Sequence, residues 1–335
     1  MLRLLAVLAA FSIAWLATAQ AETIPACRGK SLLDAVRKDR PQELAAAEGE
    51  AAAVPNGKNL LWRIEGLNGA PPSWLFGTIH LTDDRVRTLP EPVAEALGGA
   101  RALAVEIENA MDPNELSAVL AANPHLIMLP EGKQIWDLLD EVGTQRLKER
   151  LVGVSMDGGR TAKLQPWLLS TSFTVPDCES YRVMRGIKRL DDTIIEEARA
   201  RNLKVHSLEN IREQMEAMAA MPLDGQAAQL QALLDPEMTA EDRQETLIQL
   251  YLRRQIGLIF PLMERAQNGR PQLAEVVRHF AETLIVKRNH VMAERAQPLL
   301  RAGGVVIAVG AAHLPGPEGL VELLRKAGYK VAPLD

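Results

Sequence analysis

Two histidines in this sequence stand in the same local pattern. His80 ends the segment Gly77-Thr-Ile-His80, His313 ends the segment Gly310-Ala-Ala-His313, and a leucine follows each histidine. Each segment comes directly after an apolar run that is typical of a buried strand. Neutral imidazoles bind Zn²⁺, Mn²⁺ and Co²⁺ well, so two of them at one place would form part of a metal site. In the alternative interpretation, each histidine only donates a hydrogen bond to a neighbouring loop.

A hydrolytic metal site usually adds a carboxylate to its histidines and keeps one position for water. Glu106 and Glu108 are candidates because they end a predicted strand at residues 102–108, where an unpaired charge would be costly. Alternate residues of a strand face the same side, so these two side chains are expected to point the same way. Glu209 ends another apolar strand in the same manner. In the alternative interpretation, these glutamates simply pair with Arg288 or with another basic side chain.

The elements that would position these residues alternate between strand and helix at both ends of the sequence. A predicted hairpin of residues 60–65 and 73–76 leads into the first histidine, and residues 305–309 lead into the second. Glycine at the start of each motif allows a sharp exit from the strand and a close backbone approach. Because α/β sheets hold ligands at the carboxyl ends of their strands, we predict a mixed α/β sheet with a Gly-x-x-His loop from each half.

Most of the sequence between these strands is predicted to be helical. Residues 30–53 have the spacing of one helix before the hairpin, and shorter amphipathic helices are expected between residues 112 and 201. Residues 211–301 form an almost continuous helical pattern, which predicts a large helical insertion. No low-complexity linker divides the sequence, so we expect a single domain over residues 22–335.

The first 21 residues have the pattern of a signal peptide. A positive charge at Arg3 precedes an apolar run at residues 4–16, and Ala19-Gln-Ala21 matches a cleavage site. The apolar run is shorter than the ~20 residues that span a bilayer, so no stable membrane anchor is expected. The mature protein is expected to begin near Glu22 and to be periplasmic or secreted.

Cysteine content and charge restrict the interpretation further. In an oxidising compartment, Cys27 and Cys178 are expected to form one disulfide, and the alternative is two unpaired buried thiols. A net charge of −5 gives no basic surplus to neutralise phosphates, so no nucleic-acid partner is expected. The basic run at residues 182–189 is interpreted as a solvated helix face.

The motifs resemble those of the TraB/GumN family, which is related to the Tiki metalloproteases. Leu75-Phe-Gly-Thr-Ile-His-Leu81 resembles the first signature of the family, and Val309-Gly-Ala-Ala-His-Leu-Pro-Gly-Pro317 resembles its last. The segments that follow the family order between them are Leu103-Ala-Val-Glu106, Leu129-Pro-Glu-Gly132, Pro166-Trp167, Leu208-Glu209 with Gln214, and Lys287-Arg-Asn289. The resemblance extends from about residue 27 to the end of the sequence.

This resemblance implies a metal-dependent hydrolase that cleaves a peptide or another amide or ester. His80, His313 and Glu106 match the metal-site positions of the family, with Glu106 as either the third ligand or the general base. The implied cofactor is a divalent ion, with Mn²⁺, Co²⁺ and Zn²⁺ all compatible, and the implied partner is a peptide or small-molecule substrate.

Three further positions match the family near this site. Arg288 and Asn289 match a helical pair that would stabilise a developing oxyanion, and Glu209 matches another acidic position. Residues 251–256 lack an aspartate that many relatives have at this place. The alternative functions are a non-catalytic binding protein for a peptide, a glycan precursor or a metallo-cofactor, and a structural envelope protein.

Overall fold

The computed structural model describes residues 26–109, 112–153, 157–265 and 271–334 of the chain. The signal peptide predicted at residues 1–21 lies outside this part. None of the helices in the described ranges is long and apolar enough to cross a membrane.

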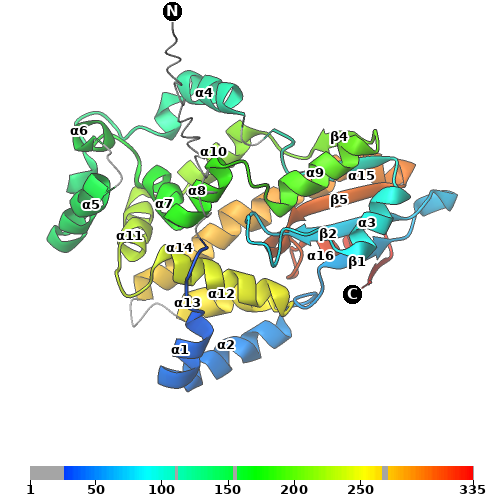
Figure 1. The fold of residues 1–335 in the computed structure, drawn as a ribbon, viewed down its shortest axis with the longest axis horizontal. Helices are drawn as coiled ribbons and strands as arrows, with labels where there is room; N and C mark the ends of the chain where they lie inside the picture. Colours follow the sequence, from blue (N-terminus) through cyan, green and yellow to red (C-terminus); the bar gives the residue numbers. More distant parts are fainter. Residues whose placement is uncertain (1–25, 110–111, 154–156, 266–270, 335) are drawn as a thin grey trace, which may run out of the picture.

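One six-stranded sheet contains the strands of the described part, in the order β4-β3-β5-β2-β1-β6 (Figure 1). The neighbours β2, β5, β3 and β4 are parallel, whereas β1 is antiparallel to both β2 and β6. The strands are β1 (Leu61–Ile64), β2 (Ser73–Thr78), β3 (Ala102–Val105), β4 (Lys204–Ser207), β5 (Val305–Gly310) and β6 (Val331–Pro333). The predicted mixed α/β sheet and its hairpin β1–β2 are therefore confirmed.

Helices cover both faces of this sheet and also form a separate group beside it (Figure 1). In chain order they are α1 (Leu32–Asp39), α2 (Pro41–Ala53), α3 (Glu91–Gly98), α4 (Pro113–Ala122), α5 (Glu141–Gly153), α6 (Gly158–Thr161), α7 (Pro166–Thr174), α8 (Asp177–Met184), α9 (Leu190–Ala200), α10 (Ile211–Ala219), α11 (Leu223–Leu233), α12 (Ala240–Leu252), α13 (Ile259–Arg265), α14 (Pro271–Ala281), α15 (Lys287–Ala302) and α16 (Leu320–Lys326). Helices α4–α9 connect β3 to β4, and helices α10–α15 connect β4 to β5.

Neighbouring residues of β2 show how the sheet is buried on its two faces. Phe76 packs against Ile194 of α9 on one face, and Leu75 packs with Met292 of α15 on the other. Each of these side chains is at most 1% exposed. Because successive side chains of a strand point to opposite faces, an apolar run with no alternation is what a sheet covered on both sides requires.

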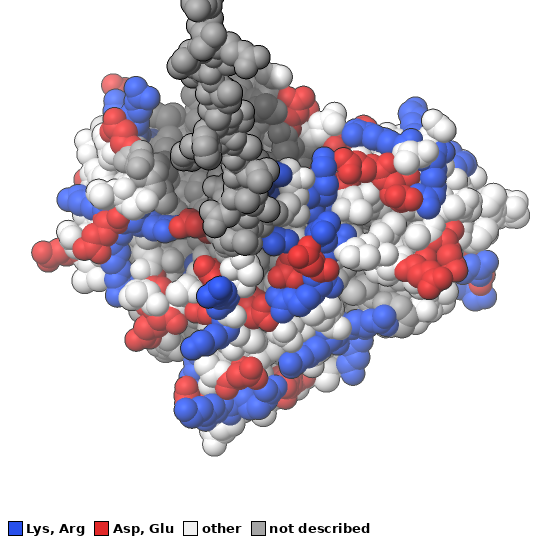
Figure 2. All heavy atoms as spheres, in the orientation of Figure 1, with Lys and Arg blue, Asp and Glu red and all other residues white. Residues whose placement is uncertain are grey.

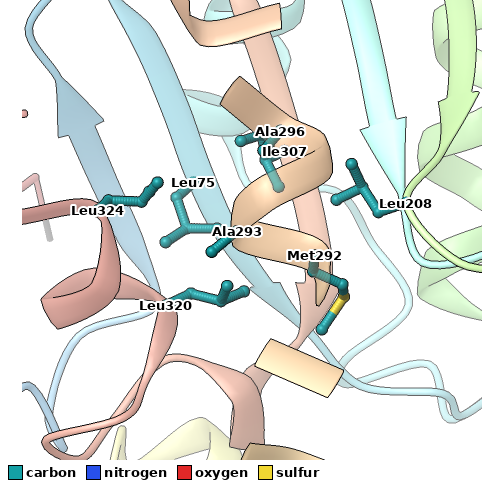
Figure 3. Close-up of a pocket in the computed structure, with 8 residues that line it drawn as sticks. All are labelled: Leu75, Leu208, Met292, Ala293, Ala296, Ile307, Leu320 and Leu324. Atoms are coloured by element: carbon teal, nitrogen blue, oxygen red, sulfur yellow. The ribbon is translucent and has the colours of Figure 1, made fainter. Parts of the chain in front are cut away.

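Small side chains let α15 lie close to the sheet. Figure 3 shows Met292, Ala293 and Ala296 of α15 beside Leu75 and Ile307, which belong to β2 and β5. Removing a buried side chain such as Met292 would leave a cavity that the backbone fills only in part. This packing fixes the N-terminal half of α15, which carries two of the candidate site residues.

Two expectations about element boundaries are wrong. The helix predicted at residues 30–53 is two helices, α1 and α2, with Arg40 in a non-helical conformation between them. Proline disfavours the helical conformation of the residue before it, and Pro41 begins α2. The strand predicted at residues 102–108 ends at Val105, so strand alternation does not govern the direction of Glu106 and Glu108.

The surface mixes the two signs of charge. Figure 2 shows Lys and Arg side chains interspersed with Asp and Glu side chains over the face that it views. The described residues also form ion pairs at the surface, such as Lys188–Glu196 and Arg150–Asp177. Exposed pairs of this kind contribute little to stability, about 0–1 kcal/mol each.

The predicted disulfide between Cys27 and Cys178 is confirmed, with 5.5 Å between the two Cα atoms. It closes a loop of 151 residues and joins the segment before α1 to the first turn of α8. A disulfide stabilises chiefly by restricting the unfolded chain, and long loops gain most in that account. We expect the Cys27→Ala/Cys178→Ala variant to lose about 2–4 kcal/mol of unfolding free energy in urea titrations. An unchanged midpoint under non-reducing conditions would contradict this.

Candidate metal centre

The two histidine motifs follow neighbouring parallel strands. β2 and β5 pair in a register that places Thr78 opposite Gly310. His80 comes two residues after the end of β2, and His313 ends a 3₁₀ turn that directly follows β5. The two histidines therefore meet at one edge of the sheet although most of the chain separates them.

The glycines of the two motifs act through space rather than through conformation. Gly77 lies inside β2, and Gly310 is the last residue of β5 with φ −51°, so neither requires the sharp exit that the sequence suggested. A Cβ atom on Gly77 would lie 2.7 Å from Cδ1 of Leu314 and 3.0 Å from Cα of Ala311. Glycine at this position allows the turn that carries His313 to pack against β2.

The next two strands bring the acidic residues to the same edge. Val105 of β3 is paired with Ala308 of β5 and with Ser207 of β4. Glu106 follows β3 immediately, and Glu209 comes two residues after β4. All four parallel strands therefore contribute at their carboxyl ends, as expected for an α/β sheet.

Glu106 lies between the two histidines. Its Oε1 atom is 3.8 Å from Nε2 of His80 and 3.8 Å from Nε2 of His313, and it accepts a hydrogen bond from the Gly310 N–H at 2.7 Å. A Cβ atom on Gly310 would lie 3.2 Å from this oxygen and 3.4 Å from Nε2 of His80. The His80 side chain is 55% exposed whereas that of His313 is 4% exposed, so the cluster opens to solvent on the His80 side.

Asp191, at the start of α9, orients the His80 ring. Its Oδ2 atom is 2.8 Å from Nδ1 of His80, and its Oδ1 atom accepts a hydrogen bond from the Thr78 hydroxyl. The charge of Asp191 raises the pKa of His80 to about 9, against the opposing effect of burial. Burial alone would raise the pKa of Asp191, but the interaction with His80 lowers it.

Asn289 performs the same task for His313. Its side-chain oxygen is 2.7 Å from Nδ1 of His313, while its amide nitrogen donates to the Glu318 carbonyl at 2.8 Å. An amide oxygen only accepts, so His313 carries its proton on Nδ1 and directs the lone pair of Nε2 toward Glu106. Burial lowers the pKa of His313 to about 4, which keeps the ring neutral at pH 7.

Arg288 lies between two buried carboxylates. Its Nη2 atom donates to Glu106 at 2.7 Å and to Glu209 at 2.6 Å, its Nε donates to Glu209 at 2.9 Å, and its Nη1 donates to the Leu284 carbonyl. Burial would raise the pKa of Glu106, but His313, His80 and Arg288 together lower it to about 2. For Glu209 burial dominates, so its pKa is raised although Arg288 opposes this.

The structure separates the two glutamates that the sequence placed together. Glu108 accepts a hydrogen bond from Arg199 at 2.7 Å, on an exposed part of the surface, and its N–H donates to the hydroxyl of Ser207. Sequence reasoning also missed Asp191, because nothing in the pair Asp191-Asp192 distinguishes the residue that faces His80. Only the packing of α9 on the sheet makes that distinction.

The three predicted ligands fit a divalent ion by their chemistry and spacing. Within the described ranges, no three His, Cys, Asp or Glu side chains form a ready-made cage for an ion. His80, His313 and Glu106 offer two nitrogens and one oxygen, with each nitrogen 3.8 Å from the oxygen. Two donors that bind one ion at about 2.0–2.2 Å are at most about 4.4 Å apart, and both nitrogen–oxygen distances lie within this limit.

Fold and site together define an α/β protein with a His-His-Glu cluster at the carboxyl ends of a parallel sheet. The chain belongs to the TraB/PrgY/gumN family, whose profile matches residues 60–333. It is 26% identical over 309 residues to metalloprotease TIKI2 of Xenopus tropicalis, covering 78% of this chain and 57% of the relative. It is 24% identical over 321 residues to metalloprotease TIKI1 of Homo sapiens, covering 82% and 61%.

The chain therefore spans about three fifths of the length of these relatives. No solved structure matches it.

Proposed function

We propose that this protein is an exported, metal-dependent hydrolase that cleaves a peptide or another amide or ester bond. The observation that carries the proposal is that Nε2 of His80 and Nε2 of His313 both face one oxygen of Glu106, while both Nδ1 atoms have fixed partners. Relatives that are named metalloproteases support the reaction class. The disulfide supports export, since disulfides persist in oxidising compartments.

His80, His313 and Glu106 would hold the ion through Nε2, Nε2 and Oε1. When bound, a divalent ion supplies a Lewis acid that polarises a carbonyl and activates water. Metal analysis after incubation with Mn²⁺, Co²⁺ or Zn²⁺ determines which of these ions is bound. Glu106 is assigned as a ligand rather than as the general base, because its Oε1 atom lies 3.8 Å from Nε2 of both histidines while its Oε2 atom accepts a hydrogen bond from Arg288.

The remaining site residues act on these ligands. Arg288 holds Oε2 of Glu106, which directs Oε1 toward the histidines, and Glu209 keeps the guanidinium in place. Asn289 fixes the tautomer of His313. Arg288 also places positive charge beside the cluster, where it would stabilise the negative charge that develops on a substrate oxygen.

The proposal is tested by the metal content of the purified mature protein after incubation with Mn²⁺, Co²⁺ or Zn²⁺. We expect one bound ion in the wild type and none in His80→Ala or His313→Ala. His125 is exposed and lies outside the cluster, so His125→Ala is the matched control and should retain the ion. Turnover of peptide or ester substrates should follow the metal content. A wild type that binds no ion under any of these conditions would favour the non-catalytic binding protein instead.

Above about pH 9, where His80 is deprotonated in both proteins, Asp191→Asn is expected to bind the ion about 10–100-fold more weakly than the wild type, the usual effect of losing a carboxylate behind a ligating histidine. The wild-type ion must displace a proton from His80, whose pKa is raised to about 9. Wild-type affinity should therefore rise by up to about tenfold per pH unit between pH 7 and 9. Calorimetric Co²⁺ titrations across this range should show that dependence shifted to lower pH in Asp191→Asn. The same pH dependence in both proteins would exclude this role for Asp191.

A further inference from the structure

Thr82 is held on all of its polar atoms by two side chains of α8. Its N–H donates to Oε1 of Glu179 at 2.7 Å, and its hydroxyl donates to Oε2 of the same carboxylate at 2.8 Å. Nε of Arg182 donates to the Thr82 hydroxyl at 2.9 Å, and Nη2 of Arg182 donates to the Thr82 carbonyl at 2.8 Å. Glu179 and Arg182 are three residues apart, so they lie on the same side of the helix.

These contacts are buried. Thr82 is 0% exposed, Glu179 2% and Arg182 9%. The interpretation of residues 182–189 as a solvated helix face is therefore wrong for Arg182, although Arg185 and Lys188 are exposed. Burying a charged side chain is costly unless other groups pair with it or hydrogen-bond to it. Here both charged side chains form hydrogen bonds with one uncharged residue, Thr82.

Through Thr82, these contacts fix the backbone next to a residue of the candidate metal centre. Thr82 comes two residues after His80, in the segment that follows β2. Asp191 holds the His80 ring from one side, and Glu179 and Arg182 hold the backbone that follows it. Ring and backbone are thus fixed by α9 and α8, both from the helical segment between β3 and β4.

We propose that Glu179 and Arg182 are positioning residues that keep the His80 loop in the conformation in which His80 faces Glu106. This inference rests on the proposed metal site, because it assigns these residues a task toward a ligand of that site. They act through Thr82 and do not touch the cluster themselves.

The covalent structure supports such a role for α8. Cys178 directly precedes Glu179, so the disulfide holds the helical turn from which the Glu179 carboxylate extends. On the other side of the disulfide, the N–H of Arg28 donates to Glu241, and the N–H of Lys30 donates to Asp242, both in α12. Helix α8 is therefore linked to α12 through the disulfide and the segment at residues 27–30.

The same helix α12 also holds the His80 loop directly. Arg85 donates to Glu245 of α12 at 2.6 Å and to Asp83 of the loop at 2.8 Å. Arg182 reaches the loop a second time, at 3.4 Å from Asp84. The loop after His80 is thus held from α8 and from α12, while the disulfide links these two supports.

The test compares Glu179→Gln with Asp177→Asn in the full mature chain. Both change a carboxylate of α8 to an amide, but Asp177 is exposed and pairs with Arg150. At a temperature where circular dichroism shows folded protein, Glu179→Gln should bind Co²⁺ about 10–100-fold more weakly, and Asp177→Asn like the wild type. In metal-free protein, hydrogen exchange of the amides at residues 79–84 should accelerate in Glu179→Gln alone.

A milder pair of variants covers the case in which Glu179→Gln fails to fold. Thr82→Val replaces the hydroxyl with a methyl group and should show the same two effects, whereas Thr82→Ser keeps the hydroxyl and should bind Co²⁺ like the wild type. A purely structural role would lower the melting temperature without changing the Co²⁺ affinity of the folded protein.

Two results separate failure of this inference from failure of the proposed function. Folded Glu179→Gln and Thr82→Val with wild-type Co²⁺ affinity and wild-type exchange would overturn the positioning role while leaving the metal site intact. Absence of Co²⁺ binding by the wild type would overturn the proposed function. In that case, hydrogen exchange at residues 79–84 in the metal-free protein alone tests whether α8 holds the loop. Unchanged exchange in Glu179→Gln and Thr82→Val would overturn the positioning role.

Discussion

Gly310→Ala is expected to weaken metal binding by more than about 100-fold in a protein that still folds. The new methyl group would lie 3.2 Å from Oε1 of Glu106, 3.4 Å from Nε2 of His80 and 3.6 Å from Cδ2 of His313. It would therefore contact all three proposed ligands at once and crowd Glu106 most closely. Backbone strain is not the cause, because φ −51° and ψ 134° at Gly310 suit alanine as well.

The Gly310→Ala substitution should reduce metal affinity strongly and protein stability only slightly. We expect the affinity for Co²⁺ to fall by more than about 100-fold, which is the upper effect of replacing a residue that only orients a ligand, since this substitution disturbs the ligands themselves. Unfolding free energy should fall by only about 1–3 kcal/mol, as for an extra methyl group in a packed site. Both are measured on one preparation, by calorimetry and by urea denaturation.

Gly49→Ala is the matched control for this experiment. Gly49 lies in α2, and a Cβ atom there has no neighbour within 4 Å. Alanine is the better helix former, so this variant should be slightly more stable and should bind the ion normally. Wild-type metal content in Gly310→Ala would mean that the ion binds elsewhere in the protein.

Much of the candidate site follows from where residues stand relative to strands. Glu106, Glu209 and the two histidines each follow a predicted apolar strand, and the carboxyl ends of parallel strands meet at one edge of a sheet. That reasoning does not provide the strand order. It is the register of β5 between β2 and β3 that places Gly310 against Glu106.

The residues that orient the ligands could not be found in this way. Asp191, Glu179 and Arg182 belong to helices of ordinary amphipathic composition, and their partners are more than 95 residues away in the chain. Their role depends on how α8 and α9 pack on the rest of the protein. A basic or acidic residue on such a helix is usually solvated, which is why the sequence predicts Arg182 at the surface.

Removal of the guanidinium between the two buried glutamates is expected to destabilise the metal-free protein at pH 7. In Arg288→Met, Glu106 and Glu209 would lose their shared cation while remaining buried. Breaking a buried ion pair from one side costs about 3–5 kcal/mol, because the remaining charge is uncompensated. Urea denaturation in the presence of a chelator measures this loss.

The control is Arg295→Met on the same helix. Arg295 is 41% exposed and pairs with Glu213 at the surface. Loss of an exposed pair costs about 0–1 kcal/mol, so the two variants should differ by several-fold in their effect. They share the helix, the residue types and the change in net charge, and differ in burial of the carboxylates.

The pH dependence of the loss identifies its cause. In the wild type the pKa of Glu106 lies at about 2, below its ordinary value of 4.5, so the ionised form contributes stability above pH 4.5 that is lost as the pH falls toward 2. Without Arg288, the pKa of Glu106 should rise from about 2 toward its ordinary value, and the already raised pKa of Glu209 should rise further. The variant would then lose stability as the pH increases above about 4.5. The difference between wild type and Arg288→Met should therefore be smallest near pH 2, where both carboxylates are protonated, and should grow as the pH rises to 7. A loss that is the same from pH 4 to pH 8 would show that Arg288 stabilises the fold through packing rather than through its charge.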